Sequence, residues 1–206
     1  MTYVSVIGAG LAGSEAAWQL AQRGVEVRLF EMRPEVQTPA HETGDFAELV
    51  CSNSLGSMLE SAAGGVLKKE LEWMDSLILQ AAQKTMVPAG GALAVDRQLF
   101  AQEVTRRLQE HPKITTIYEE CKEIPSGVVV IATGPLTSPA LTSKLQDLTK
   151  RDNLYFFDAA APIVLGESID YDQGFWAARY DKGTADYFNC PLNKEEYEDF
   201  VAALIQ

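Results

Sequence analysis

The stretch TYVSVIGAGLAGSEAAWQLAQRGVEVRLFE, residues 2–31, decides the fold class. Its first residues are apolar and partly β-branched, which predicts a strand over residues 2–8. Strong helix formers fill residues 11–24, where Gly24 is a stop signal, and they predict a helix. Alternating apolar and polar residues predict a second strand over 25–31. A strand, a helix and a strand in this order indicate a parallel β-α-β unit and therefore an α/β, Rossmann-like fold.

The glycine motif GAGLAG, residues 8–13, lies at the predicted turn from strand to helix. Gly8 permits the tight turn, Gly10 permits close approach of a pyrophosphate, and Gly13 lets the helix pack on the strand. The helix N-terminus offers N–H groups to phosphates, and Glu31 is placed to bind a ribose hydroxyl. A glycine-rich turn without a ligand is the alternative. The predicted dinucleotide site comprises Gly8, Ala9, Gly10, Leu11, Ala12, Gly13 and Glu31.

A second nucleotide signal is VVVIATG, residues 128–134, an apolar run typical of a strand buried on both faces of a parallel sheet. Together with the N-terminal glycine motif it resembles the FAD-binding class of two-dinucleotide-domain flavoproteins. That class predicts FAD contacts at Ala132, Thr133 and Gly134, although an ordinary exit from strand to loop is the alternative. Arg33 is expected to contact the adenosine or a phosphate, with an exposed loop charge as an equal alternative.

The remaining chain is divided by a predicted boundary near residue 150. We expect an FAD-binding domain over residues 1–150 and a partial, β-rich substrate region over residues 151–206. An amphipathic helix capped by Asn193 ends the sequence abruptly, which suggests truncation. The other expected elements are an irregular segment over 33–57, helices over 65–83 and 97–110, a connector over 87–95, and strands within 113–120 and 127–134.

Composition excludes several classes of protein. A content of 47% hydrophobic and 22% charged residues is typical of a globular protein with a core. The net charge of −12 argues against a uniformly basic, nucleic-acid-binding surface, without excluding a local basic patch. No apolar run reaches the ~20 residues of a membrane span, and the N-terminus lacks signal-peptide features. Three cysteines are too few for a disulfide framework or a metal site, so we expect a reduced, cytoplasmic protein without metal.

Cys51 ends an apolar run in FAELVCSNSLGS, residues 46–57. The small polar residues after it can cap a turn whose N–H groups favour a thiolate. A buried, inert cysteine is the alternative, and by itself the favoured one. His41 is a weaker candidate, as a proton donor near a cofactor, because a solvated loop histidine is more common. We interpret Cys121 and Cys190 as structural, His111 as a helix-terminating residue, and Lys68 and Lys69 as a solvated helix face.

Four longer strings carry a more specific resemblance, and they run along nearly the whole chain. They are TPAHETGDFAELVCSNSLGS, VPAGGALAVDRQLFAQEVT, DAAAPIV and RYDKGTADYFNCPLNKEEY. They resemble the bacterial folate- and FAD-dependent tRNA (uracil-5-)-methyltransferase family, TrmFO or Gid. The resemblance implies one-carbon transfer from 5,10-methylenetetrahydrofolate to C5 of the T-loop uridine of tRNA. It implies FAD as carrier and reductant, NAD(P)H as electron source, and Cys51 as a catalytic thiol beside the flavin.

Members of this family are about twice as long as this chain, and they carry a second functional cysteine and a further domain. Two alternatives therefore stay open: a non-catalytic or truncated FAD-binding module, and a related flavoprotein that modifies the tRNA wobble uridine. The sequence also leaves open whether Cys51 attacks uracil or holds the flavin.

Overall fold

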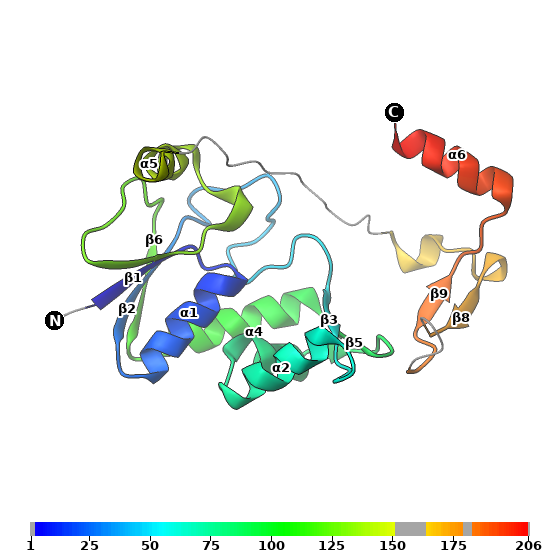
Figure 1. The fold of residues 1–206 in the computed structure, drawn as a ribbon, viewed down its shortest axis with the longest axis horizontal. Helices are drawn as coiled ribbons and strands as arrows, with labels where there is room; N and C mark the ends of the chain where they lie inside the picture. The colour runs from blue at the N-terminus through cyan, green and yellow to red at the C-terminus, as the bar shows by residue number, and fades with distance from the viewer. Residues whose placement is uncertain (1–2, 151–163, 179–182, 206) are drawn as a thin grey trace. The chain divides into compact units, whose positions relative to one another are not determined.

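The computed structural model describes residues 3–150, 164–178 and 183–205. The chain forms two compact units, Met1–Val87 with Leu93–Ala161, and Pro88–Ala92 with Pro162–Gln206. Figure 1 shows the elements of both. The boundary predicted near residue 150 falls beside residues 151–163, outside the described part of the chain, and stays a prediction.

A four-stranded parallel sheet organises the first unit, in the order β6-β2-β1-β7. Val4 of β1 pairs with Val27 of β2 on one side and with Val128 of β7 on the other. The predicted parallel β-α-β unit is confirmed, and the chain has the α/β fold. The strands are β1 (Tyr3–Ile7), β2 (Glu26–Glu31), β6 (Ile114–Tyr118) and β7 (Val128–Ile131).

Helices cover the two faces of this sheet. Figure 1 shows α1 and α4 on one side of the strands and α5 on the other. The larger core includes Val6, Leu29, Phe100 and Leu108, while Leu141 of α5 packs with Ile7 and Phe30 on the opposite face. The helices are α1 (Leu11–Gln22), α3 (Leu77–Lys84), α4 (Arg97–Gln109) and α5 (Pro139–Thr149).

Strand β7 differs from its prediction as a strand buried on both faces. It is an edge strand of the described sheet, and Val128 at its start is 60% exposed. An apolar run alone does not distinguish an edge strand from a central one, because it reports composition and not neighbours.

The helix predicted over residues 65–83 is two helices, α2 (Ala63–Trp73) and α3. Asp75, with φ of 58°, breaks the helical path between them. Ser76 then caps α3, and its hydroxyl donates to a carboxylate oxygen of Glu15 on α1 at 2.9 Å. The break is therefore fixed by a contact across 61 residues of sequence that periodicity cannot reveal.

Two further features were missed by the sequence analysis. The segment expected to be a connector contributes to a small sheet in the order β3-β5-β4, with β3 (Ser54–Ser57), β4 (Met86–Val87) and β5 (Ala92–Val95). Helix α5 was not predicted, although Ser138 accepts a hydrogen bond from the Leu141 N–H and Pro139 occupies its first turn. Ser-Pro before leucines at helical spacing is a recognisable start signal.

In its described part, the second unit contains an antiparallel pair, β8 (Phe175–Ala177) and β9 (Tyr187–Asn189), and helix α6 (Lys194–Leu204). The predicted cap at Asn193 is confirmed as a capping box with Glu196. Short 3-10 turns are η1 (Gly134–Leu136) in the first unit and η2 (Gly166–Ser168) and η3 (Tyr171–Gln173) in the second. Within the described ranges, no helix is both long and apolar enough to cross a membrane.

Candidate functional site

The turn between β1 and α1 is built from close backbone contacts at its glycines. Gly8 has φ of +92°, and a Cβ on Gly13 would lie 1.8 Å from the Gly8 carbonyl oxygen. A Cβ on Gly10, by contrast, would meet no atom within 4 Å. Gly10 is the N-cap of α1, and the Ser14 N–H bonds to its carbonyl at 2.9 Å. The preceding N–H groups of the first helical turn have no acceptor within the helix and are available to an anion.

A pocket of about 260 Å³ lies over this turn. It brings together most of the residues that the sequence predicts for the dinucleotide site. The predicted residues that line it are Gly8, Gly10, Leu11, Ala12, Glu31, Arg33, Ala132, Thr133 and Gly134. Ala9 and Gly13 lie within the turn itself. That these residues contact a ligand stays a prediction.

The end of β7 is held against the glycine turn. The Ala132 N–H donates to the Ile7 carbonyl at 2.8 Å, which extends the parallel pairing by one residue. A Cβ on Gly8 would lie 2.9 Å from the Ala132 carbonyl oxygen, so the two segments touch through their backbones. The carboxyl ends of parallel strands are where α/β folds bind ligands.

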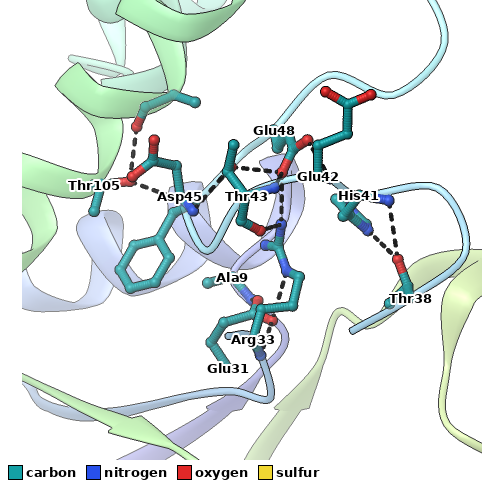
Figure 2. A network of polar contacts seen from close by, with 12 residues as sticks. Ala9, Glu31, Arg33, Thr38, His41, Glu42, Thr43, Asp45, Glu48 and Thr105 are labelled. Carbon is teal, nitrogen blue, oxygen red and sulfur yellow. Dashed lines mark hydrogen bonds and ion pairs between the residues drawn. The ribbon is translucent and has the colours of Figure 1, made fainter. Parts of the chain in front are cut away.

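Glu31 is a buried carboxylate, 5% exposed, at the end of β2. One oxygen accepts the Ala9 N–H at 3.0 Å, and the other accepts the Arg33 N–H at 3.0 Å and its Nε at 2.9 Å (Figure 2). Burial raises the pKa of Glu31, but hydrogen bonds and the charge of Arg33 outweigh burial and lower the pKa below its ordinary value. Glu31 is therefore held ionised at the pocket wall.

Arg33 is 2% exposed, so the alternative of an exposed loop charge is wrong. Its guanidinium bridges two carboxylates, because Nη1 also donates to Glu48 at 3.1 Å and to the Thr43 carbonyl at 3.3 Å. We call residues 33–48, which lie between these two carboxylate contacts, the strap.

Glu48 accepts several hydrogen bonds from residues 42 and 43 of the strap. Its carboxylate accepts the N–H of Glu42 at 2.9 Å, the N–H of Thr43 at 3.1 Å and the Thr43 hydroxyl at 2.7 Å (Figure 2). Burial raises the pKa of Glu48, whereas these hydrogen bonds and the neighbouring His41 lower it, with a net lowering. No sequence motif marked Glu48, whose partners come together only in the folded chain.

Backbone contacts seat the strap on the rest of the unit. The Ala47 N–H donates to the Ala9 carbonyl at 2.8 Å, within the glycine turn. The Phe46 N–H donates to the Thr105 hydroxyl on α4 at 2.7 Å (Figure 2). The strap therefore rests on the glycine turn and on α4, although it has no regular secondary structure.

His41 and Thr38 of the strap line the pocket. The Thr38 hydroxyl lies 2.6 Å from His41 Nδ1 and also accepts the His41 N–H at 3.2 Å. Burial, and next the charge of Arg33, lower the pKa of His41, against the opposing carboxylates of Glu48 and Glu31. His41 is half-buried in the loop and bonded to Thr38, and its role as a proton donor stays a prediction.

Cys51 is exposed, so the alternative of a buried cysteine is wrong. Its neighbour Val50 lines the pocket. The carbonyl of Cys51 accepts a hydrogen bond from Nη2 of Arg97 on α4 at 2.9 Å. The segment after Cys51 leads into strand β3 rather than into a helix. The catalytic role of Cys51 stays a prediction.

Cys121, interpreted from the sequence as structural, lines the pocket. Its thiol donates to the Glu123 carbonyl at 3.1 Å, and burial, with the charge of Glu119, raises its pKa. Its position shortly after β6 was the signal that could have placed it at the ligand-binding edge of the sheet. Cys190 is exposed.

Lys68 and Lys69 are neighbours on α2 but have different surroundings. Lys68 donates to the carbonyls of Ser57 and Gly64 at 3.1 and 3.3 Å, so it is not part of a solvated face, whereas Lys69 pairs with Glu72 at the surface. Among the described residues, no group of three or more histidine, cysteine, aspartate or glutamate side chains could hold a metal ion.

Known proteins resemble this chain along nearly its whole length. The chain is 59% identical over 202 residues to the methylenetetrahydrofolate–tRNA-(uracil-5-)-methyltransferase TrmFO of Bacillus licheniformis, covering 98% of this chain and 46% of the relative. Identity to the TrmFO of Lysinibacillus sphaericus is 61% over 203 residues, and to that of Bacillus subtilis 60% over 201 residues, with the same coverage. The chain thus spans about half the length of the curated relatives it matches.

A solved structure of Aquifex aeolicus GidA matches 61% of this chain and 21% of its own, with 18% identity and a TM-score of 0.48. The family described as glucose inhibited division protein A matches residues 3–206. The family match and the TrmFO relatives confirm the resemblance predicted from the sequence, and the chain belongs to the glucose inhibited division protein A (GIDA) family.

Proposed function

We propose that this chain is part of an FAD-dependent enzyme that methylates C5 of the T-loop uridine of tRNA. The one-carbon donor is 5,10-methylenetetrahydrofolate, and NAD(P)H supplies the electrons. The observation that carries the proposal is the identity of about 60% to relatives named for this reaction, along almost the entire chain. Because the chain spans about half of those relatives, the complete reaction is proposed for the whole protein.

The described pocket fits the pyrophosphate and ribose of FAD. The open space beside Gly10 and the N–H groups at the start of α1 suit a pyrophosphate. Glu31 has accepting capacity beyond its three donors and suits a ribose hydroxyl. Ala132, Thr133 and Gly134 also line the pocket, and Ala132 touches the glycine turn. When bound, FAD supplies the redox and one-carbon chemistry, and these residues supply position and electrostatics.

Cys51 is the proposed catalytic thiol. A thiolate is a soft nucleophile suited to addition at C6 of uracil, and this addition makes C5 nucleophilic. Its exposure permits contact with a substrate, and the Arg97 contact to its carbonyl fixes its backbone. A second role, in contact with the bound flavin, predicts a different outcome in the experiment below.

The proposed partners are tRNA, a folate and a nicotinamide cofactor, in the cytoplasm, without a membrane partner. Because the net charge is −12, we propose that the basic surface for tRNA is a local patch or belongs to another part of the whole protein.

The test is the visible absorption spectrum of the purified chain after FAD titration, before and after acid denaturation, for wild type and Cys51→Ala. We expect a flavin spectrum from both. Colour that stays with the denatured wild type but not with the variant supports the role of Cys51 beside the flavin. Full release from both supports FAD binding without assigning Cys51 a role beside the flavin, and a chain that FAD cannot colour contradicts the proposal.

A further inference from the structure

The two ends of the strap meet at one buried cation. Arg33 donates through Nε to Glu31 and through Nη1 to Glu48, and both carboxylates are mostly buried. A buried arginine with two carboxylate partners is oriented by both, because its planar guanidinium allows few arrangements. The position of Glu31 is therefore coupled to the position of Glu48.

Glu48 is suited to hold this arrangement because its partners come from the whole far end of the strap. Besides Arg33, it binds two backbone N–H groups and one hydroxyl, all from Glu42 and Thr43. In the described part of the chain, Glu48 is not among the residues that line the pocket. It can influence a bound ligand only through the groups it holds.

One of those groups, Arg33, lines the pocket directly. Glu31 and Arg33 line it at the end of β2, and Thr38 and His41 line it from the middle of the strap. Through Arg33, Glu48 is therefore linked to the carboxylate of Glu31 at the pocket wall (Figure 2).

We propose that Glu48 is a positioning residue which, through Arg33, holds the carboxylate of Glu31 in place to bind the ribose hydroxyls of an adenine nucleotide. The proposal rests on the proposed function, because it takes the pocket as the site of the nucleotide. It assigns to Arg33 a role different from direct contact with the ligand. The ligand class is a nucleoside diphosphate unit with an intact ribose diol.

The test compares ADP with 2′,3′-dideoxy-ADP by isothermal titration calorimetry, in the wild-type chain and in Glu48→Gln. Hydrogen bonds to a fixed, charged carboxylate discriminate by about tenfold or more, so the wild type should prefer ADP by that factor. Glu48→Gln keeps an acceptor for the strap but removes the charge toward Arg33. We expect its preference for ADP to fall toward one.

A purely structural role of Glu48 predicts another pattern. Loosening of the whole pocket weakens both nucleotides equally and leaves their ratio unchanged, which would overturn the proposal. Glu42→Gln is the matched control, because it neutralises an exposed carboxylate of the same strap and should keep the wild-type ratio. Thr43→Val, which removes one donor to Glu48 without changing charge, should reduce the ratio less than Glu48→Gln does.

The outcomes separate this inference from the proposed function. A wild-type chain that binds neither FAD nor ADP contradicts both. A wild type that binds and discriminates, beside a Glu48→Gln variant that discriminates equally well, overturns the role of Glu48 alone. If Glu48→Gln does not fold, Thr43→Val decides, and an unchanged ratio in that variant counts against the proposal.

Discussion

The glycine turn, residues 8–13, and the strap, residues 33–48, bound the same pocket but are held in different ways. The turn is shaped by backbone approach, with Gly13 against the Gly8 carbonyl. The strap is shaped by side-chain charge, with Arg33 buried between Glu31 and Glu48. Ala47 in the strap even adopts a φ of 53°, a conformation that a non-glycine residue keeps only where its surroundings impose it.

The difference teaches which part of a site can be recognised from residue types. Glycine spacing has a direct backbone meaning, so the turn could be assigned from six residues. A buried ion network depends on which side chains meet after folding, and its members are ordinary loop residues in the sequence. We therefore expect substitutions in the turn to destabilise the fold through steric collision, and substitutions in the strap to destabilise it by leaving buried charges unpaired.

The largest expected effect is that of Gly13→Val. Its Cβ would lie 1.8 Å from the Gly8 carbonyl oxygen, so the backbone of β1 or α1 must move. We expect a loss of more than about 4 kcal/mol in the free energy of unfolding, measured by urea denaturation, or no folded chain. Gly10→Ala is the control, since its Cβ meets no atom within 4 Å: it should fold normally and bind FAD more weakly. A normally stable Gly13→Val would refute steric control of the turn.

Arg33→Met tests the strap in the corresponding way. It removes the cation and leaves two buried carboxylates without their partner, which costs about 3–4 kcal/mol in the free energy of unfolding. Urea denaturation at neutral pH measures the loss. Lys113→Met, which breaks a surface pair with Glu26, should change stability far less. Equal losses in the two variants would show that the buried ion pairs of Arg33 contribute no more to stability than an exposed pair does.

Many elements of the chain could be predicted from the sequence, because local rules govern them. The parallel strands, the glycine turn, the cap at Asp96 and the capping box at Asn193 follow from residue types at short spacing. The break between α2 and α3 could not, since Glu15 fixes it from α1. The edge position of β7 depends on neighbours that composition does not encode.

In the candidate site too, residues that belong to a local motif could be predicted, and residues that do not could not. The predicted glycines, Glu31 and the 132–134 segment gather at one pocket, as the α/β topology requires. Thr38, Glu48 and Cys121 were missed because no motif marks them and only the folded chain brings them to the pocket or to Arg33, although the place of Cys121 shortly after β6 was a usable signal. Cys51 is placed beside a pocket-lining residue, but its chemistry is tested only by experiment.

The pH dependence of stability should also distinguish the strap from the turn. The pKa values of Glu31 and Glu48 are lowered in the folded chain. Their contribution is therefore complete above the ordinary glutamate pKa of 4.5 and is lost as the pH falls through their lower folded values. We expect stability to fall in acid below about pH 4.5, less steeply in Glu48→Gln than in wild type, by urea denaturation across pH. Equal slopes would count against ionised carboxylates in the strap. Gly10→Ala should keep the wild-type slope.

The smallest expected effect concerns Asp96, where a local rule supports both regions at once. Its carboxylate accepts the Leu99 N–H at 3.0 Å and starts α4, which holds the strap through Thr105 and the backbone of Cys51 through Arg97. Asp96→Ala should cost about 1 kcal/mol by urea denaturation, and Asp96→Asn nearly nothing. If Asp96→Ala also speeds alkylation of Cys51 while Asp96→Asn does not, the start of α4 positions that thiol. If the rates stay equal, contacts such as those of Arg97 to Cys51 and of Asn53 to Val95 anchor the segment without the cap, and the cap serves stability only.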